Sequence, residues 1–275
     1  MILDDLKWLG NLTEQERTLA EYILSYPDAI LGSTTQILAM SSYTSKATVT
    51  RLCQKLGFQG YADFKLRYAQ EQSLRQVSSQ LLVPSAIREA ASSHKAPSFT
   101  EKLYESVIAN TMALLDRQAL SHVLVKMKHC GNLAFYGTGI NYFKIQALCL
   151  RLQTLGYHAY AYDGYYRYMD TRLEATNMDK IAFVVSTTGK NPAIVESAQK
   201  LRERGIWTVA ICSRKNSTLS KMANETLLTY WNPDSTEMMM VARDISLQYI
   251  LDTLFISCYA ESLKTTSYDM SALED

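Results

Sequence analysis

The feature that most restricts the fold lies in the second half of the chain. There, five short apolar runs alternate with helical segments. The runs lie at residues 133–136, 158–162, 181–186, 208–212 and 226–230. Helical spacing of apolar residues predicts helices at about 140–155, 192–204, 217–223 and 236–263. Strands separated by helices of this length form βαβ units, and hence a parallel sheet covered on both faces. We therefore expect an α/β flavodoxin-like domain with a five-stranded parallel sheet.

The first eighty residues differ, because their apolar residues keep helical spacing. Thr13 and Glu16 have the spacing of a capping box near the start of a helix at 12–26, which Pro27 ends. Another helix is expected at 61–80, and its apolar positions are Phe64, Leu66, Tyr68 and Leu74. With the two helices described next, this pattern predicts an all-α N-terminal domain of four or five helices.

Residues 34–56 have the layout of two short helices joined by a tight turn. The first helix is predicted at 34–40 and the turn at 41–44. Ser45 is suited to cap the second helix, because its hydroxyl can accept an unpaired amide proton, and Gly57 is suited to end that helix. An apolar stripe that would hold the second helix to the body consists of Val49, Leu52, Cys53 and Leu56.

The opposite face of this second helix mixes short hydroxyls with long cationic and amide side chains. Such a helix can enter a major groove, where Arg and Gln reach base edges while Lys and Thr hold phosphates. The candidate DNA-binding residues are Ser45, Lys46, Thr48, Thr50, Arg51, Gln54 and Lys55. An ordinary amphipathic helix with a solvated outer face has the same pattern and remains an alternative. Charge favours DNA, since residues 46–75 hold six Lys or Arg against two Asp or Glu, the reverse of residues 1–45.

Composition excludes several classes of protein. The chain of 275 residues is 47% apolar and 20% charged, which is typical of globular proteins. Its apolar runs are too short for a membrane span, and its acidic start contains no apolar signal region. Five scattered cysteines without a CxxC pair predict reduced thiols in a cytoplasmic protein, with no zinc site and no disulfide framework. We expect no metal and no cofactor.

Helical periodicity fades between the two halves of the chain. Residues 81–100 contain Pro84, Pro97 and several serines, and they predict a linker with a short helical piece at 86–91. A new helix is expected from Thr100. The predicted organisation is therefore a DNA-binding domain at 1–80, a linker at 81–100 and the α/β domain at 101–275.

Two strand ends carry small hydroxyl residues and glycines just before a predicted helix. Backbone amides at such a helix start can point at an anion, and Lys190 adds a positive charge. A phosphate or another anionic oxygen group is the expected ligand. The candidate ligand-binding residues are Gly137, Thr138, Gly139, Asn141, Ser186, Thr188, Gly189, Lys190 and Asn191. Plain strand-to-helix turns favour the same residue types and remain an alternative.

Two further interpretations of these loops are weaker. Gly137 and Gly139, with Asp163 after the next run, hint at a dinucleotide fold, but Tyr142 stands where the third glycine belongs. An isomerase would need a base aimed at a carbon-bound proton, and the obvious candidates are Glu196, His122, His129 and His158. Each of them has an ordinary explanation as a surface side chain, so we expect no enzyme activity and no catalytic residues.

Both halves resemble one known family. Residues 12–69, with Ala39, Ser45, Ala47-Thr48-Val49, Arg51, Leu56-Gly57-Phe58, Gly60 and Phe64-Lys65, resemble the helix-turn-helix domain of the RpiR family of bacterial transcriptional regulators. Residues 101–270 look like the sugar isomerase (SIS) domain that follows it in that family. The resemblance implies a cytoplasmic homodimer or homotetramer, paired through its SIS domains, that binds double-stranded operator DNA. It also implies that a phosphorylated sugar in the SIS domain modulates operator affinity.

The sequence departs from the family pattern at two ligand-loop positions. A serine is usual where Asn141 stands, and a threonine is usual where Asn191 stands, so the loop reads STTGKN. Both changes remove a hydroxyl from the expected phosphate pocket, which leaves open an atypical ligand or a degenerate pocket that has lost its effector. A phosphosugar isomerase-like enzyme, or a scaffold that binds neither DNA nor sugar, is also compatible with this sequence.

Overall fold

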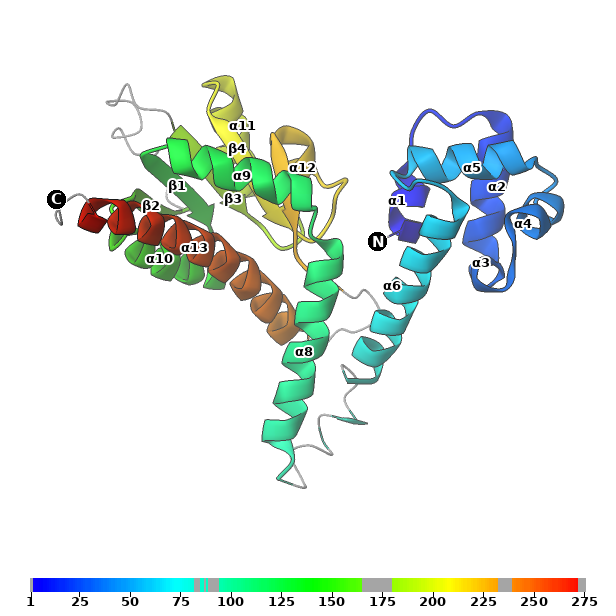
Figure 1. The fold of residues 1–275 in the computed structure, drawn as a ribbon, viewed down its shortest axis with the longest axis horizontal. Coiled ribbons are helices and arrows are strands. Elements are labelled where there is room, and N and C mark those ends of the chain that lie inside the picture. Colours follow the sequence, from blue (N-terminus) through cyan, green and yellow to red (C-terminus); the bar gives the residue numbers. More distant parts are fainter. Residues whose placement is uncertain are drawn as a thin grey trace. The chain divides into compact units, whose positions relative to one another are not determined.

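The computed structural model describes residues 2–81, 85, 86, 88, 94–164, 180–231 and 239–271. Its contacts divide the chain into two compact units, Met1–Leu81 and Leu82–Asp275. Each unit is described by itself below, and the elements carry the labels of Figure 1.

The N-terminal unit is helical and contains more helices than the sequence pattern predicts. Its helices are α1 (Ile2–Trp8), α2 (Glu14–Ser25), α3 (Ala29–Gly32), α4 (Thr35–Ser41), α5 (Lys46–Lys55) and α6 (Tyr61–Leu81). The two that pattern reasoning missed, α1 and α3, have seven and four residues. Segments this short give little periodicity, and packing rather than propensity stabilises them.

One apolar core joins the helices of this unit. Leu19 from α2 and Leu52 from α5 pack with Phe64 and Tyr68 of α6, whose rings are stacked at a centroid distance of 6.3 Å. Phe64 and Tyr68 are four residues apart, so they share one face of α6. Leu66 lies between them in sequence and is exposed instead, so its assignment to the apolar positions of this helix is wrong.

The C-terminal unit is built on a five-stranded parallel sheet, as predicted. Its strands are β1 (Asn132–Gly137), β2 (His158–Asp163), β3 (Lys180–Val185), β4 (Trp207–Cys212) and β5 (Glu225–Leu228). Their order is β2-β1-β3-β4-β5, and every neighbouring pair is parallel. This is the flavodoxin-like order, and it reverses direction between β1 and β3.

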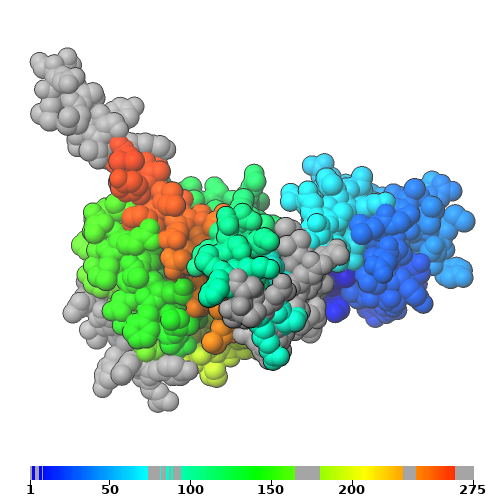
Figure 2. Space-filling view, turned by 90° about the horizontal axis from the view of Figure 1, so that it is seen from below, coloured from blue at the N-terminus to red at the C-terminus, as the bar shows by residue number. Residues whose placement is uncertain are grey.

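Helices cover both faces of this sheet (Figure 1). They are α9 (Arg117–His129), α10 (Ile140–Gln153), α11 (Pro192–Glu203), α12 (Thr218–Met222) and α13 (Met239–Ser271), while a further helix, α8 (Ala96–Leu114), packs on α13. Residues of α9, α10 and α13 pack on the face that carries the stacked rings of Phe135 and Phe183, 4.4 Å apart. Residues of α11 and α12 pack on the opposite face. Figure 2 shows the green atoms of α10 beside the orange atoms of α13, and Arg151 of α10 binds Asp252 of α13 at 2.5 Å.

The start of α8 differs from the prediction. The helix begins at Ala96 rather than Thr100, and Pro97 lies in its first turn, where a missing amide proton has no cost. The short helical piece expected at 86–91 lies mostly outside the described residues. Whether residues 81–100 act as a linker stays a prediction. Within the described residues, no helix is long and apolar enough to cross a membrane.

Candidate DNA-binding and effector sites

The turn between α4 and α5 has the predicted helix-turn-helix geometry. Ser45 is extended at φ −102° and ψ 157°, and its Oγ accepts the amide proton of Thr48 at 3.1 Å, which confirms it as the N-cap. Before it, the Ser42 hydroxyl donates to the Leu38 carbonyl at 2.7 Å and lies 2.9 Å from the Thr44 hydroxyl. These bonds fix the direction in which α5 leaves the turn.

Helix α5 has the two unlike faces that the sequence indicates. Val49, Leu52 and Cys53 are buried in the core of the unit, whereas Arg51 and Gln54 are exposed. Lys46 and Ser45 are also exposed, and Thr50 is half-buried, with its hydroxyl donating to the Lys46 carbonyl at 3.1 Å. The outer face can therefore present Lys46, Arg51 and Gln54 to a ligand, and their contact with DNA stays a prediction.

Thr48 does not have the exposed position that the predicted DNA contact requires. Its side chain is fully buried, and its hydroxyl bonds to Gln15 Oε1 at 3.2 Å and to Ser45 Oγ at 2.9 Å. A buried hydroxyl cannot reach a phosphate. The spacing argument failed here because Thr48 lies one position before the buried Val49, on the flank of α5 that α2 covers.

Lys55 also has a different partner from the predicted one. Its Nζ lies 2.6 Å from Glu16 Oε2 and donates to the Asn11 carbonyl at 2.9 Å. Glu16 is only 1% exposed, and its Oε2 also accepts the Thr13 amide proton at 2.9 Å. The hydrogen bonds from Lys55 and Thr13 outweigh the effect of burial and lower the Glu16 pKa to about 2. Lys55 is thus the countercharge of a buried carboxylate and ties α5 to the start of α2.

The sequence held one clue to this contact, because the Thr13 and Glu16 capping box is present as predicted. A capping glutamate normally points outward, so its second bond, to a lysine 39 positions away, had no local signal. The Gln15 contact with Thr48 was missed for the same reason.

In the other unit, the loop after β1 approaches α10 closely. A Cβ on Gly137 would lie 3.0 Å from Ile145 Cδ1 and 3.2 Å from the Tyr142 amide nitrogen, so a side chain there would fit only if its neighbours shifted by a few tenths of an ångström. Gly139 precedes α10 at φ 56°. Asn141 is half-buried in the first turn of α10.

The loop after β3 is held by its own hydrogen bonds and by α12. Ser186 is buried, and its Oγ accepts the Asn191 amide proton at 3.5 Å. Gly189 has φ +65°, and a Cβ there would lie 2.3 Å from Ser217 Oγ. Thr188 and Lys190 are exposed, and the Lys190 amide donates to the Thr188 hydroxyl at 3.3 Å. The loop therefore exposes the side chains of Thr188 and Lys190.

Asn191 removes the free amides that we expect at the start of α11. Its Oδ1 accepts the amide protons of Ala193 at 3.0 Å and Ile194 at 3.3 Å, and Pro192 has none to offer. The expectation of unpaired amides aimed at an anion is therefore wrong for this helix. An anion here would depend on side chains, Lys190 in particular, more than on the helix terminus.

The two loops meet at the point where the strand order reverses. Asn191 Nδ2 donates to Thr138 Oγ1 at 3.3 Å, which links the β3 loop to the β1 loop. In doubly wound sheets this crevice, beyond the carboxyl ends of the strands, is where ligands bind. The structure thus brings together Thr138 and Asn191, which the sequence assigned to one site. Their role in ligand binding stays a prediction.

The three candidate histidines lie away from these loops, whereas Glu196 lies one turn into α11, the helix that follows the β3 loop. His158 starts β2 and His129 ends α9 before β1, so both lie near the amino ends of the strands. His122 pairs with Glu225, the first residue of β5, at 2.9 Å. Glu196 is exposed on α11 and binds Lys200 at 2.7 Å. The described residues contain no cluster of three metal-binding side chains, and all five cysteines are buried.

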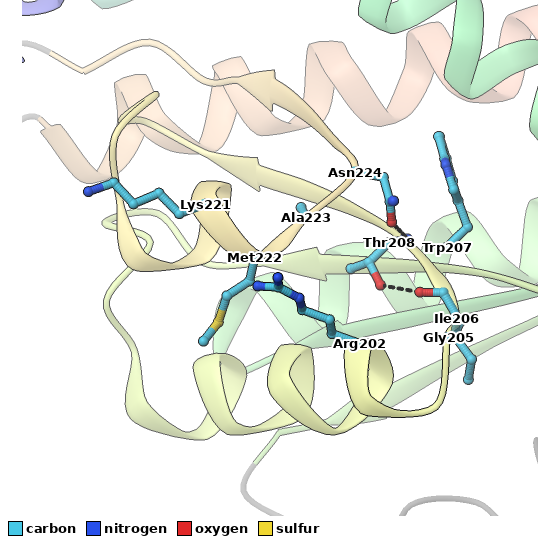
Figure 3. A pocket seen from close by; sticks show the side chains of 9 residues that line it. All are labelled: Arg202, Gly205, Ile206, Trp207, Thr208, Lys221, Met222, Ala223 and Asn224. Atoms are coloured by element: carbon cyan, nitrogen blue, oxygen red, sulfur yellow. Dashed lines mark hydrogen bonds between the residues drawn. The ribbon is translucent and has the colours of Figure 1, made fainter. Parts of the chain in front are cut away.

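A pocket of about 270 Å³ lies at the amino end of β4 (Figure 3). Its polar backbone groups are largely paired, since the Thr208 amide donates to Asn224 Oδ1 at 2.8 Å and the Thr208 hydroxyl to the Ile206 carbonyl at 2.9 Å. Figure 3 shows Lys221 extending away from the other lining residues. The pocket lies at the amino ends of the strands, away from the β1 and β3 loops at their carboxyl ends.

Comparison with known proteins agrees with the division of the chain into a helical unit and an α/β unit. A family described as "Helix-turn-helix domain, rpiR family" matches residues 7–75, and the SIS domain family matches residues 126–257. The HTH-type transcriptional regulator YbbH of Bacillus subtilis is 28% identical over 267 residues, which are 93% of this chain and 89% of that protein. HexR of Escherichia coli is 26% identical over 247 residues, which are 88% of this chain and 82% of HexR.

Among solved structures, the Vibrio vulnificus NanR protein complexed with ManNAc-6P is 21% identical. It covers 99% of both chains with a TM-score of 0.51, so the two proteins share a fold. With the helix-turn-helix domain first, the SIS domain second, and transcriptional regulators as relatives over most of its length, the chain belongs to the RpiR family of transcriptional regulators.

Proposed function

We propose that this regulator binds operator DNA through the outer face of α5, and that a phosphorylated sugar between the β1 and β3 loops changes its operator affinity. The observation that carries the first half is the capped helix α5, which buries Val49 and Leu52 while it exposes Lys46, Arg51 and Gln54. Arg and Gln at such positions reach base edges, and a nearby Lys can hold a phosphate.

Operator binding can be tested with duplexes from the region upstream of the gene and its neighbours. Arg51→Ala should weaken operator binding by about 1–3 kcal/mol and relax base preference at one position, because a guanine contact is lost. Arg67 is an exposed arginine on α6, so Arg67→Ala is a matched control that should keep the base preference. Fluorescence anisotropy at two salt concentrations measures both. Equal effects of the two variants would contradict a base-reading role of α5.

The second half of the proposal rests on the crevice between β1 and β3. Ser186, Thr138 and Asn191 surround the loop junction, and Lys190 lies exposed beside it as a cation for an anionic group. NanR, whose structure was solved with a phosphosugar, shares this fold. A ligand that favours one arrangement of the loops would shift operator affinity by a coupling free energy of about 1–3 kcal/mol.

A panel of phosphosugars in thermal-shift and anisotropy assays tests the effector. Ser186→Ala should blunt the ligand response and leave operator binding intact. Ser197 donates its hydroxyl only to the Ala193 carbonyl of its own helix, at 2.9 Å, so Ser197→Ala is the matched control. No response to any phosphosugar, in the wild type, would favour a degenerate pocket.

Pairing of SIS domains is also part of the proposal, as a homodimer or homotetramer. Phe143 and Leu150 are exposed on α10, and Ile256 and Leu263 are exposed on the adjacent helix α13. Exposed apolar patches of this kind mark interaction sites. A two-fold pair would present two α5 helices to a palindromic operator. Phe143→Glu should lower the mass measured by light scattering and weaken operator binding together; an unchanged mass would contradict this interface.

We further propose that the chain is not an isomerase and acts in the cytoplasm, where operator DNA is found. Support comes from the placement of His122, His129 and His158 near the amino ends of the strands and from the pairing of Glu196 with Lys200. Conversion of a sugar phosphate by the purified chain, without operator binding, would favour an enzyme instead.

A further inference from the structure

Tyr43, in the turn before α5, has a backbone conformation that its residue type disfavours. The non-glycine residues with positive φ among the described residues are Asn11 at 57°, Tyr43 at 53° and His94 at 52°. Asn and His are enriched in this left-handed region, whereas a bulky residue there is an outlier. Such strain tends to be kept where it serves a function.

The strain belongs to a helix-ending motif that the chain repeats with glycine. At the end of α4, the Tyr43 amide donates to the Met40 carbonyl at 3.1 Å and the Thr44 amide to the Ala39 carbonyl at 2.8 Å. This pair of bonds is the Schellman motif, whose left-handed position is usually glycine. The same pair closes helix ends at Gly57, Gly156 and Gly205, where φ is 89°, 85° and 69°. Helix closure alone therefore gives no reason for a tyrosine at position 43.

The side chain gives no compensation within the domain. Tyr43 is 95% exposed, the highest value among the exposed large apolar side chains of the described residues. Tyr26 is 60% exposed, and its ring contacts that of Tyr22 at a tilt of 42° with the centroids 5.1 Å apart. In the described part of the chain, the Tyr43 ring stacks on no aromatic ring and its hydroxyl makes no hydrogen bond. A solvated ring on a strained backbone is expected to make its contacts with a partner molecule.

The position of Tyr43 indicates which partner. It lies two residues before the N-cap Ser45 and three before the exposed Lys46. The N-terminal residues of a recognition helix are those that approach the bases, so the turn just before it faces the flanking sugar-phosphate chain. Tyrosine hydroxyls donate to phosphate oxygens, and such contacts hold the protein without reading sequence.

We infer that Tyr43 is a DNA-backbone contact, with its hydroxyl on a phosphate and its ring against the adjoining deoxyribose. The inference rests on the proposed operator binding by α5. It assigns the strain at this turn to DNA affinity rather than to folding.

Backbone strain and DNA contact can be tested separately, because replacing Tyr43 should leave or raise the melting temperature but lower operator affinity. Tyr43→Asn relieves the left-handed conformation, so it should keep or raise the melting temperature while operator affinity falls. Tyr43→Phe removes only the hydroxyl and should weaken operator and scrambled duplexes alike, by about 2- to 10-fold, without change in melting temperature. Tyr26→Phe, an exposed tyrosine of the same unit, is the matched control and should bind both duplexes like the wild type.

Several results would overturn this role. Wild-type affinity in both Tyr43 variants would show that Tyr43 does not contact DNA. An affinity loss that matched a fall in melting temperature would show that Tyr43 serves the fold of the domain. A change in oligomeric mass for Tyr43→Asn would show a protein partner instead. Failure of the wild type itself to retain any duplex would refute the proposed operator binding, and so is distinguishable from failure at Tyr43.

Discussion

Replacing Glu16 by glutamine should loosen α5 from α2 and destabilise the N-terminal unit at neutral pH. Lowering the Glu16 pKa from 4.5 to about 2 corresponds to about 3 kcal/mol, at about 1.4 kcal/mol per pKa unit. The Lys55 side chain is 38% exposed, so water screens part of this interaction. We expect glutamine, which keeps the shape but not the charge, to cost about 1–2 kcal/mol.

The loss should depend on pH in a defined direction. Because the folded-state pKa lies below the ordinary value of 4.5, the stabilisation from ionised Glu16 is complete above about pH 5 and disappears as the pH falls toward 2. The stability difference between wild type and Glu16→Gln should therefore shrink steadily over that interval. Subtracting one protein from the other cancels the titration of the remaining carboxylates.

Hydrogen exchange of the full chain is the suitable assay, because it reports on each unit separately. The amides of α2 and α5 should exchange about 5- to 30-fold faster in Glu16→Gln at pH 7, while those of β1 and β3 should not change. Glu14 is exposed in the first turn of the same helix, so Glu14→Gln is the control. Equal exchange in wild type and variant at pH 7, or a difference that did not shrink between pH 5 and pH 3, would refute the ion pair as a stabilising contact.

Three further perturbations test other contacts. Lys55→Ala should cost about 2–4 kcal/mol because Glu16 keeps a buried, unpaired charge, yet the salt slope of operator binding should stay at the wild-type value in titrations from about 50 to 200 mM salt. Gly189→Ala should lower the stability of the SIS domain by about 2–4 kcal/mol in thermal unfolding, since its Cβ would lie 2.3 Å from Ser217 Oγ at a φ of +65°. Asn191→Asp should keep the α11 cap but weaken an anionic effector at least about 10-fold by calorimetry, because the donor to Thr138 becomes a negative charge; unchanged affinity would place the effector elsewhere.

The local pattern of the sequence was sufficient for the strands and for most helices, but not for α1, α3, the start of α8 or the end of α13, which reaches Ser271 rather than residue 263. The five strands begin and end within two residues of their predicted positions, and Ser45, Gly57 and the Thr13 capping box occupy their predicted places. These features depend on hydrogen bonds between residues a few positions apart and on the period of apolar side chains. Both are visible in a single sequence, and the alternation of strands and helices then leaves few sheet topologies.

The candidate sites were predictable as regions but not as sets of contacts. Thr48 and Lys55 have the residue types of DNA ligands, and only their neighbours across the domain, Gln15 and Glu16, show that they serve the interior. In the sequence, Asn191 indicates only that the hydroxyl of the usual threonine is missing. In the structure, Asn191 caps α11 and joins the β1 and β3 loops.

The sequence by itself therefore determined the order of the domains, the parallel sheet and the face of α5 that points away from the core. The tertiary structure alone decided which polar groups on those elements are still available to a partner. The physical reason is that each polar group has only a few donor and acceptor sites, and the group that occupies them here often lies tens of residues away, as Thr138 does from Asn191.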